Sequence, residues 1–272
     1  MTTSNVRKSH FDQTCVSLDL ETTGLNSDRE EIIQIGAVKF RGYEILETFD
    51  SMVNPRRTIS NFITQLTGIT QQDVDTAPSL ADVSEQLIAF LGDFPLIGHN
   101  IAFDIDFLSK AGLRITSPSY DTHHLASVFL PNAGEYSLVG LTAALGIQHL
   151  RPHRALDDAY ACQNLFLALV EKILNTHSNV LPSLAAISRR SAWPLGNLLE
   201  NLTQITLGRH EDTLDVSLNI RQISNNNEEK NVRDAKTIGF SIGSSDTEQK
   251  KGGLMTPISY AYDVCHTDNH LV

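Results

Sequence analysis

The sequence predicts a mixed α/β fold, and two patterns along the chain support this prediction. Residues 14–20, 31–40 and 43–53 alternate apolar and polar side chains, which is typical of strands, and polar turns join them into a meander. After residue 54 the apolar period changes from two to 3.6 residues, which is typical of amphipathic helices. A meander that is followed by alternating strands and helices indicates a mixed sheet.

The expected elements after the meander follow from the same periodicity. Short helical pieces are expected around the LTGIT stretch at 66–70, and a longer helix over 79–91 carries leucines and a valine on one face. Two short buried strands and three further helices complete the prediction. The strands are expected over 95–98 and 119–122, and the helices over 101–112, 137–145 and 155–174.

Composition limits the class of protein. The chain has 272 residues, of which 41% are hydrophobic, so it can bury a sizeable core. We find no apolar leader and no run of about 18 uncharged apolar residues, and therefore expect a cytoplasmic protein without a membrane segment. Cys15, Cys162 and Cys265 lie far apart, which excludes a zinc-binding spacing and favours reduced thiols.

The net charge of the chain bears on whether it binds nucleic acid. The formal charge is −11, and most of the excess acid lies in residues 1–176. Proteins that bind nucleic acid usually carry a basic surface, so this charge argues against a nucleic-acid partner. The argument weakens if some of the acids bind metal ions.

The chain divides into four parts by amino-acid composition and pattern. A flexible N-terminus over 1–13 precedes the main domain at 14–175. Residues 176–221 are expected to form a short helical connector, with two helices broken at Trp193-Pro194. Residues 222–272 are polar and low in hydrophobicity, which predicts a disordered or partner-dependent tail.

The first group of acids ends the first strand, in the stretch VSLDLETTGL. Side chains two apart in a strand point to the same face, so Asp19 and Glu21 project together. Taken alone, such a pair is usually a solvated strand end. If it is functional, a cation would relieve the repulsion between the two carboxylates.

The second group follows the buried strand at 95–98. Asn100 is the expected N-cap of the next helix. Asp104 lies one turn into that helix, facing back to the strand end, whereas Asp106 is rotated about 200° away and is expected to be solvated.

The third group, HRALDDA, opens the long helix at 155. Asp158 lies in its first turn, and His153 lies on the preceding loop. Each has an ordinary alternative, because helix N-termini favour acids and loop histidines are often only polar surface residues.

Together, the blocks D-x-E-T-T-G-L, H-N-x-x-F-D-x-x-F-L and H-R-A-L-D-D-A resemble the three motifs of the DEDDh family of 3′-to-5′ exonucleases. The resemblance extends over about residues 14–172. Within the family, this part of the chain is similar to the proofreading exonuclease of bacterial DNA polymerase III. It implies a ribonuclease H-like fold, a mixed five-stranded sheet flanked by helices, here with a C-terminal extension.

The resemblance also implies a mechanism. Asp19, Glu21, Asp104 and Asp158 would hold two Mg²⁺ or Mn²⁺ ions, which clamp the attacking and leaving oxygens of a phosphodiester. His153 would accept the proton of the attacking water, as an imidazole can near neutral pH. A nucleoside 5′-monophosphate would leave.

A substrate pocket is implied by the same motifs. Thr22 and Thr23 would lie near the 3′ end, and Asn100 beside the metal site. Leu25 and Phe103 would contact bases without reading their identity, although ordinary packing remains an alternative for both.

Three functions stay open at this point. The first is an exonuclease on a free single-stranded DNA 3′ end, in proofreading or repair. The second is an RNA-trimming exoribonuclease, because the motifs do not report contacts to the 2′-OH. The third is a non-catalytic module that tethers a polymerase or helicase through the tail, and the complete set of acids counts against it.

Overall fold

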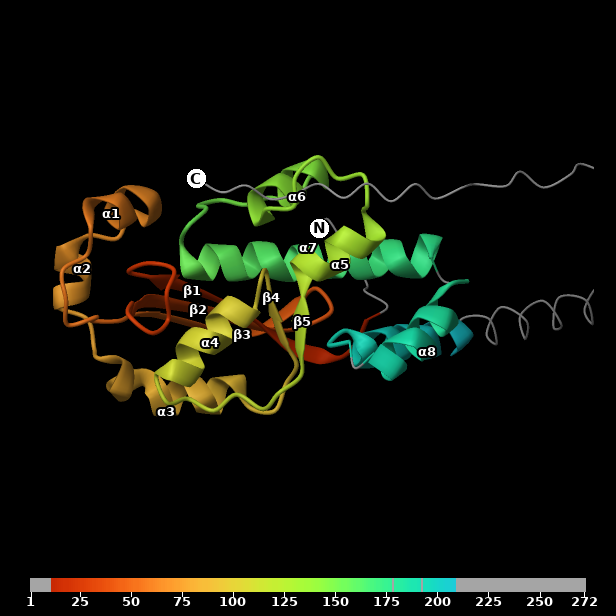
Figure 1. Cartoon of the computed structure of the whole chain (residues 1–272), viewed down its shortest axis with the longest axis horizontal. Coiled ribbons are helices and arrows are strands. Elements are labelled where there is room, and N and C mark those ends of the chain that lie inside the picture. Colours follow the sequence, from red (N-terminus) through yellow and green to blue (C-terminus); the bar gives the residue numbers. More distant parts are fainter. Residues whose placement is uncertain (1–10, 178, 192, 209–272) are drawn as a thin grey trace, which may run out of the picture. The chain divides into compact units, whose positions relative to one another are not determined.

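The computed structural model describes residues 11–177, 179–191 and 193–208. Its centre is a five-stranded sheet with the strand order β3-β2-β1-β4-β5 (Figure 1). The strands are β1 (Thr14–Thr22), β2 (Ile32–Arg41), β3 (Glu44–Met52), β4 (Leu96–Gly98) and β5 (Ser119–Asp121). The first three pair antiparallel, and β4 pairs parallel to both β1 and β5. The mixed sheet that the sequence predicted is confirmed.

The helices confirm most of the expected elements. The structure has α1 (Asn61–Thr67), α2 (Gln71–Asp75), α3 (Leu80–Leu91), α4 (Ala102–Lys110), α5 (Thr122–Phe129), α6 (Leu138–Ala144), α7 (Ala155–Thr176) and α8 (Leu181–Ser191). The sequence did not predict α5. This helix begins directly where β5 ends, because the Asp121 carboxylate accepts hydrogen bonds from the backbone N–H groups of His123 and His124.

Helices cover both faces of the sheet (Figure 1). On one face, Val16, Leu18 and Leu20 of β1 pack in a core with side chains of α3 and α4. On the other face, Cys15 and Ile97 pack in a second core with side chains of α5, α6 and α7. The alternation of β1 side chains between two cores follows from the strand period of two.

The helical segments after α7 belong to this second core. Leu181 of α8 and Leu198 in the helical stretch 196–208 are fully buried in it. Phe11 is fully buried there too, with its ring centroid 5.3 Å from that of Phe166. The expected flexible N-terminus over 1–13 is therefore wrong for Phe11.

All the described residues lie in one compact unit. The helical part of the connector expected over 176–221 thus packs within the same unit as the sheet. The tail expected to be disordered over 222–272 lies outside the described residues.

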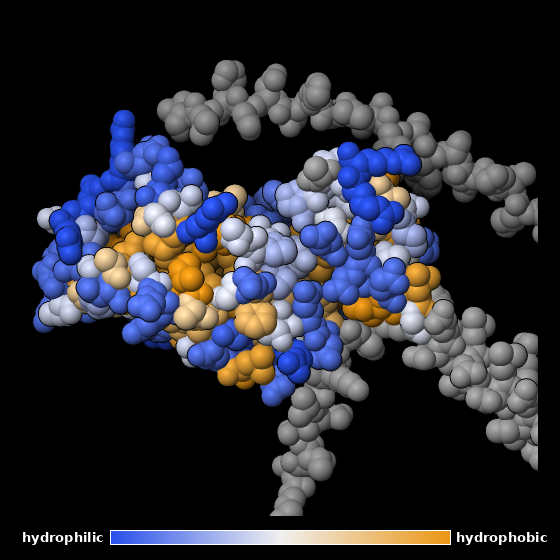
Figure 2. All heavy atoms as spheres, turned by 90° about the horizontal axis from the view of Figure 1, so that it is seen from below, coloured by the Kyte–Doolittle hydropathy of each residue, from blue (hydrophilic) through white to orange (hydrophobic). Residues whose placement is uncertain are grey.

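The described surface mixes hydrophilic and hydrophobic areas. On the face that bears α3, hydrophilic side chains alternate with hydrophobic areas (Figure 2). None of the helices in the described ranges is long and apolar enough to cross a membrane.

Cys15 and Cys162 are free thiols in the interior, and burial raises the pKa of each to about 12.

Candidate active site

The C-terminal end of β1 places two acids beside the first turn of α4. Asp19 and Glu21 lie two residues apart on the strand, as the sequence predicted. The Asp104 Oδ1 atom accepts a hydrogen bond of 2.9 Å from the Leu20 backbone N–H. This bond joins the helix to the strand at Leu20, the residue between the two β1 acids.

The two aspartates of α4 differ as expected. Asp104 is buried, and Asp106 is exposed and accepts a hydrogen bond from the Ser27 hydroxyl. The prediction that Asn100 is the N-cap of this helix is wrong, because Ile101 occupies that position. Asn100 instead has a left-handed backbone with φ of 61° and turns the chain from β4 into α4, an exposed position that asparagine tolerates.

The N-terminus of α7 is fixed against β2. The side-chain oxygen of buried Gln34 accepts hydrogen bonds from Arg154 Nε at 3.2 Å and from the Ala155 backbone N–H at 3.3 Å. The Gln34 amide nitrogen donates to Asp50 Oδ1 at 2.8 Å, which fixes the side chain from its other end. These bonds hold the start of α7 against β2.

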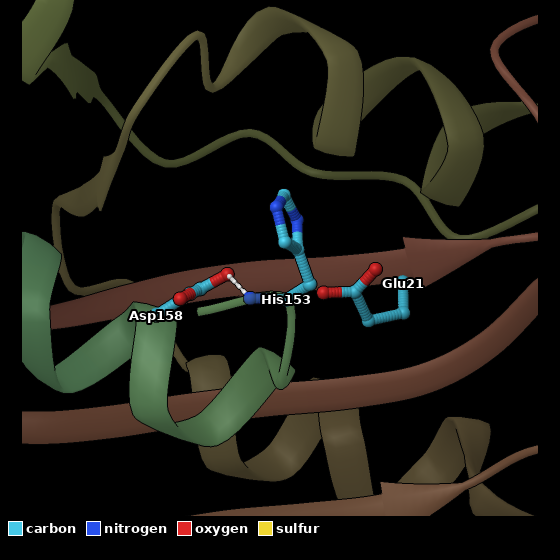
Figure 3. Close-up of side chains that lie close together, drawn as sticks. All are labelled: Glu21, His153 and Asp158. Carbon is cyan, nitrogen blue, oxygen red and sulfur yellow. Dashed lines mark hydrogen bonds between the residues drawn. The ribbon is translucent and has the colours of Figure 1, made fainter. Parts of the chain in front are cut away.

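The first turn of α7 brings Asp158 to the β1 acids. A ligand atom from each of Glu21, His153 and Asp158 lies within 4.8 Å of the others, an arrangement that could hold a metal ion (Figure 3). Asp158 Oδ2 accepts a 3.0 Å hydrogen bond from the His153 backbone N–H, drawn dashed in Figure 3. This bond supports the left-handed backbone of His153, whose φ is 64°.

The electrostatics of the cluster are those of acids that are buried close to one another. Burial, followed by the nearby charges of Asp104, Asp158 and Glu21, raises the pKa of Asp19 well above its usual value. Burial and the charge of Asp158 raise the pKa of Glu21 to about 7, although Arg154 opposes this. Burial also raises the pKa values of Asp104 and Asp158. Bringing a cation among these acids would favour their ionised forms.

The residues expected to contact substrate surround this cluster unevenly. The Thr22 hydroxyl donates to the Gly24 carbonyl at 2.7 Å, and the Thr23 hydroxyl donates to Glu30 at 2.5 Å. Leu25 is 88% exposed, so ordinary core packing is excluded for it. Phe103 is half-buried, with its ring centroid 4.8 Å from that of Phe107. Contact of these side chains with a nucleotide remains a prediction.

Three contributors to the site were missed in the sequence. His149 donates from Nε2 to Asp158 Oδ1, Gln34 holds the start of α7, and Gly36 leaves room for the α7 backbone. Only Gly36 had a signal, because a glycine inside a strand often marks a close approach of another backbone.

Comparison with known proteins identifies the family. A family model described as an exonuclease, RNase T, matches residues 16–166, which is more than half of the chain. The chain belongs to this exonuclease family. Its motifs place it among the DEDDh 3′-to-5′ exonucleases, which are nucleases of the hydrolase class.

Curated relatives cover the same region. The chain is 37% identical over 162 residues to the PolC-type DNA polymerase III of Caldanaerobacter subterraneus subsp. tengcongensis, a match that spans 58% of this chain and 12% of the relative. It is 34% identical over 194 residues to the 3′-5′ exonuclease DinG of Bacillus subtilis, spanning 69% of this chain and 21% of that relative. The chain thus matches only a small part of either protein.

Solved structures share the fold. Exonuclease X in complex with 5′ overhanging duplex DNA is 25% identical, with a TM-score of 0.51 over 58% of this chain and 91% of that one. The nuclease domain of 3′hExo, a DEDDh family member bound to rAMP, is 22% identical, with a TM-score of 0.52 over 60% of this chain and 94% of that one. The ribonuclease H-like sheet flanked by helices agrees with both.

Proposed function

We propose that this protein is a metal-dependent 3′-to-5′ exonuclease that removes nucleoside 5′-monophosphates from a free DNA 3′ end. The observation that supports this most is the convergence of four carboxylates from three separate elements, β1, α4 and α7, with raised pKa values. Buried acids that repel one another cost stability, so their collection at one point calls for a functional reason.

The acids fit divalent cations. Asp19, Glu21, Asp104 and Asp158 would hold Mg²⁺ or Mn²⁺, since hard cations prefer carboxylate oxygens. A cation would also offset the burial and the mutual repulsion that raise the pKa values of Asp19 and Glu21. When bound, two such ions would stabilise the charge that develops on the attacking and leaving oxygens of a phosphodiester.

The other side chains of the site would prepare the substrate. His153 is exposed beside the acids and would take the proton of the attacking water on its imidazole. Leu25 and Phe103 would lie against the terminal bases, with Thr22, Thr23 and Asn100 around the last nucleotide. Because the Leu25 side chain is largely exposed to solvent, it is free to contact a base.

We favour DNA as the substrate because of the names of two relatives. A PolC-type DNA polymerase III and a DinG 3′-5′ exonuclease match the chain over its motifs, which favours a role in proofreading or repair. The PolC-type relative supports a polymerase partner that the tail would contact, and a helicase partner is the alternative. RNA trimming is the alternative outcome of a direct comparison on matched DNA and RNA oligonucleotides.

The deciding experiment compares a circular and a linear single strand of the same DNA sequence. We expect the linear strand to be consumed to mononucleotides in Mg²⁺ or Mn²⁺, the circle to survive, and EDTA to stop the reaction. His153→Ala should lower kcat by about 10²- to 10⁴-fold, the usual contribution of a general base. Rapid internal cutting of the circle, or full activity of metal-stripped protein in EDTA, would contradict the proposal.

A further inference from the structure

The loop between α6 and α7 turns one imidazole inward. His149 lies in this loop, and its side chain is only 6% exposed, whereas the neighbouring Gln148 and Leu150 are exposed. A polar ring buried on an irregular loop needs a partner to offset its lost hydration. Its partner is one of the four carboxylates of the site.

His149 Nε2 hydrogen bonds to Asp158 Oδ1. An ionised carboxylate only accepts hydrogen bonds, so Nε2 carries the proton and donates it. The other ring nitrogen, Nδ1, is buried and has no hydrogen-bond partner in the part of the chain that the structure describes. The ring is therefore held in the site by the single bond to Asp158.

Both oxygens of Asp158 are oriented by the same loop. Oδ1 accepts from the His149 side chain, and Oδ2 accepts from the His153 backbone N–H at 3.0 Å. A carboxylate offers about four acceptor positions, so these two bonds leave others free to face a cation. Fixing both oxygens selects one rotamer of Asp158 and one position of the loop that carries His153.

We propose that His149 is a positioning residue that orients the Asp158 carboxylate for metal binding and anchors the loop that carries His153. This inference rests on the proposed function, because it concerns the same metal site. It assigns to His149 a role through Asp158 only, without contact to the substrate or to the reacting atoms.

The expected size of the effect follows from other metal sites. Losing a group that hydrogen bonds to a metal ligand costs about 10- to 100-fold in metal affinity or activity. Replacing His149 by a ring of similar size that has no N–H donor should therefore weaken metal binding by this factor. Replacing it by a side chain with an amide N–H donor should recover part of the affinity.

The test measures Mn²⁺ affinity directly, by titration of the full chain and electron paramagnetic resonance of free Mn²⁺, without substrate. The variants are His149→Phe, which keeps a ring but no donor, and His149→Gln, which keeps an N–H donor. Arg151→Ala is the matched control, because Arg151 lies on the same loop but pairs with Asp157 at 2.8 Å. Circular dichroism confirms that each variant is folded.

We expect His149→Phe to bind Mn²⁺ about 10- to 100-fold more weakly, with the same relative loss in kcat and an unchanged KM for the oligonucleotide. His149→Gln should be closer to wild type, and Arg151→Ala should match it. Wild-type Mn²⁺ affinity in His149→Phe would overturn the inference alone, as would equal losses in the Phe and Gln variants. A wild-type chain without Mn²⁺ affinity would overturn the proposed function and this inference with it.

Discussion

Gly36 on β2 lies directly opposite Asp19 on β1 in the antiparallel register, and the backbone of α7 passes over this pair. A β carbon at Gly36 would lie 2.1 Å from the carbonyl carbon of Ala155 and 2.2 Å from the backbone nitrogen of Leu156. No side chain could occupy this space without moving the helix. The absence of a side chain at Gly36 therefore lets α7 start close enough to β1 for Asp158 to join the acids there.

Gly36→Ala should destabilise the protein and weaken the site together. Overpacking a core usually costs about 1 to 3 kcal/mol, and we expect at least the upper end because the clash is with backbone. Urea denaturation would measure the change in the free energy of unfolding. Gly134→Ala is the matched control, since a β carbon there meets nothing within 4 Å, and it should be nearly neutral. Equal stability of the two variants would contradict this account.

The metal-free protein should become less stable as pH rises. Glu21 has a pKa of about 7 in the folded chain against an ordinary 4.5, so it binds a proton more tightly when folded. Its contribution to stability is present below about pH 4.5 and is lost as pH rises through about 7, up to about 3 kcal/mol.

Urea denaturation in EDTA at pH 4.5 and 8 would test this on the wild type and on Glu21→Gln, which cannot ionise. The two proteins should be similar at pH 4.5, and the variant should be the more stable one at pH 8. Saturating Mg²⁺ should restore the wild type at pH 8, because a bound cation favours the ionised acid. A difference between the proteins that does not change with pH would exclude this explanation.

Sequence periodicity was sufficient for the sheet and most helices, but not for features that depend on distant packing. Alternating strands identify themselves locally, whereas the burial of Phe11 depends on Phe166 in α7. The helix α5 was missed because its N-cap, Asp121, is also the last residue of a strand. The boundary between two adjacent elements has no turn residue to mark it.

The site divides in the same way. Its acids stand in three recognisable blocks, and the structure brings Glu21, His153 and Asp158 together. The supporting contacts have no such pattern, because a histidine nine residues before an aspartate is not a motif. His149 could be found only once the loop path between α6 and α7 was known.

The two aspartates of α4 should differ sharply in their effect on catalysis. Asp104 is buried beside β1 and Asp106 is exposed, although they lie two residues apart. Asp104→Asn should lower kcat by orders of magnitude, because the amide loses the charge that a cation requires. Asp106→Asn should stay within a few-fold of wild type. Single-turnover rates on a linear DNA oligonucleotide would measure both, and similar losses would remove Asp104 from the proposed metal site.

The helical stretch 196–208 should be required for the stability of the main fold. Leu198 is fully buried in the core that also holds Phe11 and Phe166, and Leu207, on the same stretch, is 48% exposed. Leu198→Ala should lower the free energy of unfolding by about 2 to 5 kcal/mol, the usual cost of such a cavity, and Leu207→Ala should cost little. One cooperative urea transition, followed by both far-ultraviolet circular dichroism and Trp193 fluorescence, should move to lower urea in Leu198→Ala. If fluorescence alone moved while the circular dichroism transition stayed in place, these helices would unfold separately from the sheet, and their packing would not be what stabilises it.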